Sequence, residues 1–428
     1  MAVNTLASAA MKMLSLLCSL VMVPITIDYL DTEHYGIWMA ITSILYWFCF
    51  MDIGLGNGMR NYMAEAFARD DYEKASSYFS TAIILLTGIA LVILLVALPV
   101  ICLADLGRLF NTRIGGLTVV MTIAVVLSLV QFVAKNVGMV YIAMQRYAAN
   151  DLIVFLGNIT SVVIIFILTK TTTGNLSYVV TAALGAPTLL FLLAYIPLKR
   201  ELPQLAVRVS AIDWGIARQI VGKGLGFFAI QITSCLVIFG SANVFISHYC
   251  GPEQVTVYNV SYKLFNLLIV AYTIFLSPLW NAYTDAYVKQ DYAWLRSTFV
   301  RSLKMWGLSV LGGVALLAVS GWFFEKWVGD SVSIPFDVSA CILVYVSAFN
   351  LNNCVTYLVN GLNKIRIQIV TSIVMTAAYL IAVLCIKGTW GIIGITLAMA
   401  GAYLLMATVH LYQCHLLLHG KARGIWDR

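Results

Sequence analysis

Long runs of apolar residues, separated by short polar stretches, fill most of the chain. A membrane-spanning helix needs about 20 predominantly apolar residues. Twelve charge-poor segments approach or exceed that length, at 9–30, 36–60, 77–104, 114–145, 152–169, 176–198, 225–247, 255–284, 303–324, 336–360, 365–386 and 389–412. The pattern predicts an all-α polytopic membrane protein with twelve transmembrane helices. Four segments contain a proline, at Pro24, Pro99, Pro187 and Pro278, and there we expect kinks rather than breaks because neighbouring helices can satisfy the freed carbonyls.

The stretch from Asp52 to Phe79 recurs 220 positions later in the chain. Between positions 61 and 79, six residues coincide with their shifted partners, at Asn61, Ala66, Asp71, Tyr72, Ser77 and Phe79. This density of identities indicates an ancient duplication. Each half holds six apolar segments, an even number, so the repeat is parallel and ligand sites are expected between the halves. We predict an N-terminal bundle at 1–198, a linker at 199–224 and a C-terminal bundle at 225–428, around a central cavity.

The composition excludes a water-soluble globule, because 61% of residues are hydrophobic and only 11% are charged. Of the 26 lysines and arginines, 19 fall on the side of the N-terminus, 5 on the other side, and Lys135 and Lys263 within segments. Basic residues concentrate in cytoplasmic loops, so both termini are expected in the cytoplasm. The net charge of +7 is then a feature of membrane orientation, which removes the main reason to expect a nucleic-acid partner.

Charged side chains within a span cost about 2.5–3.5 kcal/mol each and usually face a cavity. At 1.5 Å per residue, Lys135 is about 15 Å from the cytoplasmic end of its segment, and Lys263 about 12 Å from the outer end of its own. Polar residues at helical spacing accompany them, notably Asn259, Asn266 and Asn281 on the segment of Lys263 and Lys12 on the first segment. We expect these side chains and Arg60, near the cytoplasmic mouth, to line the cavity. The alternative for the polar residues is hydrogen bonding between packed helices. For Lys135 and Lys263 it is a structural ion pair, and for Arg60 it is contact with lipid phosphates.

Asp52 lies about 24 Å into the second segment and precedes Gly54, Gly56 and Gly58. A carboxylate at that depth can bind a proton or cation that drives transport, or it can shape the glycine-rich turn. Both interpretations stay open. Asn61, Glu65 and Asp285 lie at matched cytoplasmic ends of the repeated motif and suggest a gate or contacts between the halves.

Sequence signatures of catalysis are absent. The chain has no G-x-x-x-x-G-K-[ST] loop and no H-E-x-x-H motif, and its five histidines do not cluster with carboxylates. The outer loops are too short for the catalytic loop expected of a membrane glycosyltransferase or polymerase. We therefore expect a protein that is not an enzyme and needs neither metal nor cofactor.

Four motifs carry a family resemblance, V-P-I-T-I-D-Y-L-D-T-E-H-Y-G-I-W (23–38), S-I-L-Y-W (43–47), D-I-G-L-G-N-G-M-R-N (52–61) and S-P-L-W-N-A-Y-T-D-A-Y (277–287). They resemble the bacterial O-antigen (Wzx-type) flippases and related polysaccharide export proteins, in the superfamily that includes multidrug and toxin exporters. The resemblance implies a MATE-like fold. It also implies movement of undecaprenyl-pyrophosphate-linked oligosaccharide from the cytoplasmic to the outer leaflet of the bacterial inner membrane. It assigns roles to Asp52, Arg60, Asn61, Asn281 and Asp285.

The implied partners are the lipid-linked glycan, membrane lipids, H⁺ or Na⁺ as a coupling ion, and the polymerase and chain-length machinery of the same pathway. One alternative is a multidrug or metabolite exporter of the same superfamily. Another, from a different class, is a membrane glycosyltransferase or polysaccharide polymerase.

Overall fold

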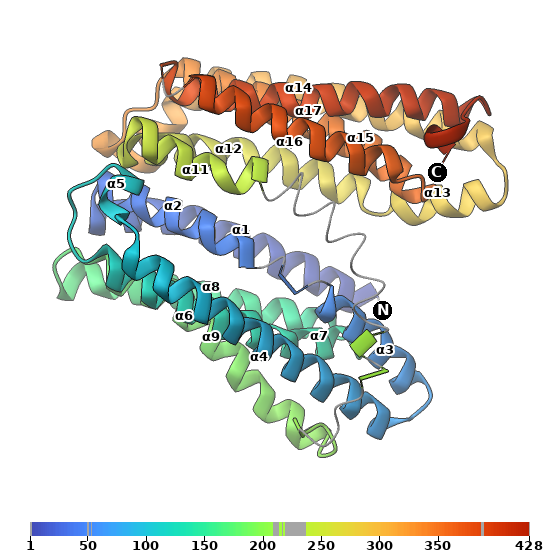
Figure 1. Cartoon of the computed structure of the whole chain (residues 1–428), viewed down its shortest axis with the longest axis horizontal. Helices are drawn as coiled ribbons and strands as arrows, with labels where there is room; N and C mark the ends of the chain where they lie inside the picture. The colour runs from blue at the N-terminus through green and yellow to red at the C-terminus, as the bar shows by residue number, and fades with distance from the viewer. Residues whose placement is uncertain are drawn as a thin grey trace. The chain divides into compact units, whose positions relative to one another are not determined.

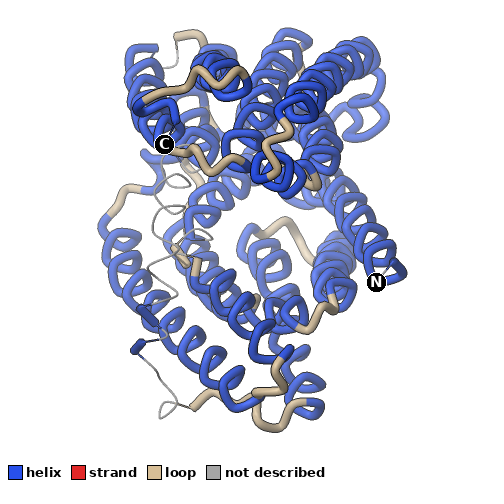
Figure 2. Tube along the Cα trace, turned by 90° about the vertical axis from the view of Figure 1, so that its right-hand side faces the viewer, coloured by secondary structure: helices blue, strands red, loops and turns tan. Residues whose placement is uncertain are grey.

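The computed structural model describes residues 2–48, 51–52, 54–208, 214–215, 217–218, 237–386 and 389–427. Every regular element in these ranges is a helix (Figure 1, Figure 2), which confirms the predicted all-α class. The internal contacts divide the chain into two units, Met1–Phe228 and Ala229–Arg428. The separate linker at 199–224 stays a prediction, since much of its second half lies outside the described residues.

The first unit contains helices α1 (Ala2–Leu30), α2 (Thr32–Phe48), α3 (Leu55–Ala68), α4 (Tyr72–Leu103), α5 (Leu106–Phe110), α6 (Leu117–Ala134), α7 (Asn136–Ala143), α8 (Tyr147–Thr171) and α9 (Leu176–Glu201). The second contains α11 (Val237–Cys250), α12 (Pro252–Leu276), α13 (Leu279–Val288), α14 (Tyr292–Val328), η3 (Gly329–Ser331), α15 (Phe336–Gly361), α16 (Arg366–Ile386), α17 (Gly391–Leu418) and η4 (Gly424–Asp427).

Ten helical stretches of the described residues are long and apolar enough to cross a membrane. This number is consistent with twelve spans, because the predicted segment 225–247 falls partly outside the described residues and the segment 36–60 is divided between two shorter helices, of 17 and 14 residues. The segment 36–60 was wrongly predicted as one helix, since α2 ends at Phe48 and α3 begins at Leu55. Gly54 there has φ = 75°, a left-handed conformation that glycine adopts at no steric cost.

Prolines inside the predicted spans behave in two ways. The helices continue through Pro24, Pro99 and Pro187. At Pro278 the helix is locally distorted: α12 ends at Leu276 and α13 starts at Leu279, while Ser277 and Pro278 between them keep right-handed helical dihedrals. Proline has no N–H to continue the ladder of helical hydrogen bonds, and its ring clashes with the preceding turn.

The internal repeat extends to the hydrogen bonds of its turns. Asp70 and Gln290, which are 220 positions apart, both adopt left-handed φ values, 56° and 58°. The next residues, Asp71 and Asp291, each donate a backbone N–H to the carbonyl five positions earlier, at 3.0 and 2.9 Å. Their carboxylates then cap the following helix by accepting the N–H three positions later. The two copies of the repeat thus share the same helix C-terminal turn and the same N-terminal cap.

A second matched feature is an ion pair in each unit. Arg146, before α8, contacts Glu201 at the end of α9 through two hydrogen bonds of 2.7 and 2.5 Å. Lys364, before α16, lies 2.9 Å from the Asp427 carboxylate, which follows α17. The hydrogen bond to the carboxylate raises the pKa of Arg146 and of Lys364, so both cations stay charged at physiological pH. In each unit the pair ties an interhelical turn to the end of the last long helix.

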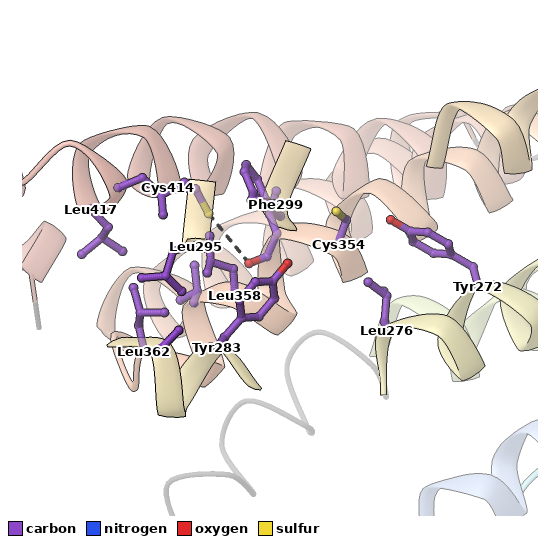
Figure 3. Packing of buried hydrophobic residues seen from close by; sticks show 14 residues of the cluster. Tyr272, Leu276, Tyr283, Leu295, Phe299, Cys354, Leu358, Leu362, Cys414 and Leu417 are labelled. Carbon is purple, nitrogen blue, oxygen red and sulfur yellow. Dashed lines mark hydrogen bonds between the residues drawn. The ribbon is translucent and has the colours of Figure 1, made fainter. Parts of the chain in front are cut away.

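The core of the second unit joins five helices, α12, α13, α14, α15 and α17 (Figure 3). Its labelled side chains are Tyr272, Leu276, Tyr283, Leu295, Phe299, Cys354, Leu358, Leu362, Cys414 and Leu417. The buried tyrosine hydroxyls are satisfied inside it, since Tyr272 donates to the Ser302 carbonyl at 2.9 Å and Tyr283 lies 3.1 Å from the Ser302 hydroxyl. This packing holds α12 and α13 against the rest of the unit.

Candidate functional site

A pocket of about 340 Å³ lies within the first unit, between α2, α6 and α9. Its wall is mostly aromatic and aliphatic, with a polar group of four residues. The lining residues are Thr42, Leu45, Tyr46, Phe48, Ser128, Gln131, Phe132, Lys135, Leu184 and Phe191. An apolar pocket with a few convergent polar groups is typical of a ligand site.

Lys135 supplies the only formal charge among the residues that line this pocket. Its side chain is half-buried, and Nζ lies 5.3 Å from the centroid of the Phe132 ring. In the part of the chain that the structure describes, no carboxylate lies within ion-pair distance of it. A cation without an acidic partner is available to an anionic ligand.

The regular helical hydrogen bonding is interrupted at Lys135, which lies between α6 and α7 and keeps right-handed helical dihedrals. The N–H of Gly138 bonds to the Lys135 carbonyl only three positions back, at 3.0 Å. The Asn136 side chain donates to the carbonyls of Phe132 and Val133 at 2.9 and 3.2 Å. Because this amide satisfies carbonyls that a continuous helix would use, the break is tolerated inside the bundle.

The start of α3, just after Asp52, lies close to Asn136. Asp52 accepts a hydrogen bond from the Gly54 N–H at 3.1 Å. A Cβ atom at Gly56 would lie 2.7 Å from Asn136 Oδ1 and 3.3 Å from Asp52 Oδ2. Gly56 on α3 therefore adjoins both the predicted coupling residue Asp52 and Asn136, which follows Lys135, and its lack of a Cβ atom permits this close approach.

Other residues of the first motif lie on α3. Arg60 is half-buried and donates to the side-chain oxygen of its neighbour Asn61 at 3.2 and 3.0 Å. Glu65 is exposed and pairs with Arg69 one turn later at 2.7 Å. None of these side chains lines the pocket of Lys135, so their predicted roles in binding and gating stay predictions.

Lys12 is held by an acidic residue that the sequence interpretation missed. Asp151, on α8, lies 3.6 Å from Lys12 Nζ and also accepts a hydrogen bond from Ser8. The predicted fifth segment began at 152 because charges were used to mark its ends, although the helix begins at Tyr147. The available signal was the continuation of the apolar helical pattern on both sides of Asp151.

In the second unit, the predicted polar stripe on α12 takes part in packing. The side chains of Asn259 and Asn243 exchange two hydrogen bonds, at 2.9 and 3.3 Å, between α12 and α11. Asn266 accepts from the Tyr262 hydroxyl at 3.2 Å. Lys263 is half-buried on the same helix. The interhelical alternative thus accounts for the observed contacts of Asn259, and roles for these residues in a cavity remain predictions.

The second copy of the motif lies on α13. Asn281 is exposed, and Asp285 pairs with Lys289 at 2.7 Å. This pair is the counterpart, 220 positions later, of the pair between Glu65 and Arg69. Both copies therefore keep a carboxylate and a cation one helical turn apart on an exposed face.

Comparison with known protein families gives a match over residues 1–279, to a family described as polysaccharide biosynthesis protein. A Salmonella typhi protein described as an O-antigen transporter is 21% identical over 340 residues, which cover 77% of this chain and 75% of that protein. A Yersinia pseudotuberculosis protein described as an O-antigen export protein is 22% identical over 290 residues, covering 64% and 63%.

Solved structures show the same fold. A multidrug resistance MATE family transporter of the MOP superfamily, in an inward-facing conformation, matches with a TM-score of 0.79 at 16% identity, over 97% of this chain and 98% of that one. An outward-facing conformation of such a transporter matches with a TM-score of 0.61 at 16% identity, over 99% and 95%. The predicted MATE-like fold is confirmed, and the chain is a multi-pass membrane protein.

Proposed function

Because the chain belongs to the polysaccharide biosynthesis protein family, we propose that it is a flippase for undecaprenyl-pyrophosphate-linked oligosaccharide. It moves this lipid from the cytoplasmic to the periplasmic leaflet of the bacterial inner membrane by alternating access. Both termini lie in the cytoplasm. The similar proteins described in O-antigen transport and export support the polysaccharide substrate.

The observation that carries the proposal is the pocket of Lys135. A diphosphate joined to sugars cannot cross about 30 Å of hydrocarbon without a polar path, whereas its polyprenyl tail can stay in lipid. Lys135 offers a positive charge among aromatic side chains, beside the polar groups of Gln131 and Ser128. The ammonium group binds the phosphates, and the aromatic wall packs against apolar faces of the sugars.

The other predicted residues extend this path. Lys263 and Lys12 bind the diphosphate at other depths, and Arg60 attracts it at the cytoplasmic mouth. Asn259, Asn266 and Asn281 contribute hydrogen bonds, while Asn61, Glu65 and Asp285 act in gating. The glycan then passes to the polymerase and chain-length machinery of the same pathway.

Transport against a gradient needs a coupling element, and we assign this role to Asp52. Binding of H⁺ or Na⁺ by its carboxylate favours one orientation of the protein over the other by a differential free energy. Its position supports the assignment, since Asp52 lies beside Gly56, which in turn packs against Asn136 next to Lys135.

The second candidate function is export of drugs or metabolites, which the MATE neighbours represent by fold. The single charge in the pocket is positive, which favours anionic over cationic ligands. A membrane glycosyltransferase or polymerase, the remaining alternative, would act on the glycan chemically.

Deletion of the gene tests all three functions. If the protein is a flippase, complete lipid-linked repeat units should accumulate in the cytoplasmic leaflet of the deletion strain. Their accessibility to a membrane-impermeant glycan-modifying enzyme in oriented vesicles measures this accumulation. Complementation with Lys135→Ala or Lys263→Ala should restore little export at normal membrane levels, and Lys→Arg should restore part of it.

Lys170→Ala is the matched control. Lys170 also lies over a ring of its own helix, with Nζ 5.8 Å from the Phe166 centroid, but it does not line the pocket. It should leave export unchanged. Truncated glycans in the deletion strain would indicate that the protein is a transferase. Short polymers on the outer leaflet would indicate a polymerase. Normal glycans together with drug sensitivity would indicate an exporter.

A further inference from the structure

Asp151 is an acidic residue inside the first unit that has no role in the proposed function. It lies in the candidate span Tyr147–Thr171, and its side chain is 13% exposed. Helix α1 packs beside α8 (Figure 1), and Asp151 Oδ2 accepts a hydrogen bond from Ser8 on α1. The neighbouring Asn150 donates to Asp151 Oδ1 at 3.1 Å. Both carboxylate oxygens therefore have a neutral donor that is independent of any lysine.

Lys12 differs from its partner in exposure. Its side chain is 70% exposed, and Nζ lies 3.6 Å from Asp151 Oδ2, longer than the 2.7–2.9 Å typical of a charge-assisted hydrogen bond. Ser8 and Lys12 are four residues apart and share one face of α1. The pair thus combines a mostly buried anion, held by two neutral donors, with a loosely held, exposed cation.

We propose that Lys12 is a movable anion-binding group, that Asp151 holds it while no ligand is bound, and that a diphosphate displaces the carboxylate from it. The inference rests on the proposed function and adds a positioning residue to it. Displacement is tolerated because Ser8 and Asn150 keep Asp151 hydrogen-bonded after Lys12 leaves, so no buried charge is left without partners.

The arrangement also determines selectivity. A ligand engages Lys12 only when it attracts the ammonium group more strongly than one carboxylate does. A diphosphate, with more than one negative charge, meets this condition better than a monophosphate, and a neutral ligand does not meet it. Asp151 therefore competes with the ligand for Lys12 and lowers the affinity for weakly charged ligands most.

The test is binding of inorganic pyrophosphate and inorganic phosphate to the purified full-length protein in lipid nanodiscs, measured by calorimetry. Asp151→Asn keeps the shape of the side chain and removes its charge. It should tighten pyrophosphate binding by about two- to fivefold, the range expected for a partly exposed ion pair, and should reduce the preference for pyrophosphate over phosphate. Lys12→Ala should weaken binding, and adding Asp151→Asn to Lys12→Ala should change nothing further.

A second variant predicts the opposite sign. Ser8→Ala removes a neutral donor from the carboxylate, which then holds Lys12 more strongly, so pyrophosphate binding should weaken by about twofold. This variant keeps the test decisive if Asp151→Asn does not fold. If Asp151 has only a structural role, Asp151→Asn should lower the melting temperature and leave the affinities for pyrophosphate and phosphate unchanged. That result would overturn the proposal. The proposal would also be overturned if Asp151→Asn changed the pyrophosphate affinity equally in the unaltered protein and in the Lys12→Ala variant.

The outcome is separable from that of the proposed function. If the affinities follow the predicted pattern but the deletion strain flips its glycans normally, the polysaccharide function fails and the exchange of Lys12 stands. If export depends on the protein and Lys12→Ala binds pyrophosphate as well as the unaltered protein does, the exchange fails and the proposed function stands.

Discussion

Replacing Lys135 with methionine should make the protein more stable and less active at once. Methionine keeps a long, flexible side chain in the pocket but removes the charge. An ionisable side chain within a span costs about 2.5–3.5 kcal/mol, and the Phe132 ring, 5.3 Å from Nζ, recovers about 0.5–1 kcal/mol of this. Half-burial of the side chain lowers the remainder, so we expect a net gain of about 1–2 kcal/mol. For a unit of this size that corresponds to a rise in Tm of about 2–8 °C.

The loss of binding follows from the same charge. A hydrogen bond from the ammonium group to a phosphate contributes about 1.5–3 kcal/mol, so the affinity for a polyprenyl diphosphate should fall by about 10- to 150-fold. Thermal unfolding in nanodiscs gives the first quantity, and competition against a fluorescent polyprenyl diphosphate gives the second. Lys170→Met is the matched control, since it removes a lysine over a ring outside the pocket, and neither quantity should change.

The two measurements refute the reasoning in different ways. A fall in Tm would mean that Lys135 has a stabilising partner and is not an unpaired cation reserved for a ligand. Unchanged affinity with a raised Tm would mean that the lysine is tolerated in the pocket without binding the diphosphate.

Three further outcomes are expected. A topology reporter inserted at Gly251 should lie outside and one at Val207 inside, because 19 basic loop residues fall on one side and 5 on the other. Asp52→Asn, which cannot titrate, should lower the dependence of export on an imposed pH or sodium gradient in vesicles while substrate binding stays nearly intact. Gly157→Ala should destabilise the first unit by about 1–3 kcal/mol, because its Cβ would lie 2.8 Å from a backbone atom of α9; Gly307→Ala, with nothing within 4 Å, should not.

Each of these has a contrary result. Reversed signals at both reporter sites would overturn the orientation, and a reversal at one site would indicate a miscounted span. Unaltered gradient dependence in the asparagine variant would leave Asp52 with its structural role in the turn before α3. Equal melting temperatures for the two alanine variants would show that α8 and α9 can separate without cost.

Most of the spans, the fold class and the duplication were predictable from sequence because each depends on local or periodic information. Apolar length decides whether a segment can cross the bilayer, since hydrocarbon offers backbone groups no hydrogen-bond partners. The 220-residue shift places Asp71 on Asp291. In the structure each of these aspartates follows a residue in the left-handed conformation, and each caps the helix that comes after it. The cap needs only residues within one turn, so a local pattern suffices.

The partners of polar residues within the bundle were decided by tertiary structure alone. Lys135 and Lys12 look alike in sequence, as single lysines in apolar segments, yet one lines a pocket without an acidic partner among the described residues and the other lies beside Asp151. The difference arises from α8, more than a hundred residues from Lys12, whose rotation about its axis brings Asp151 toward α1. Helix rotation is set by packing against several neighbours at once, and no stretch of sequence around either lysine contains that information.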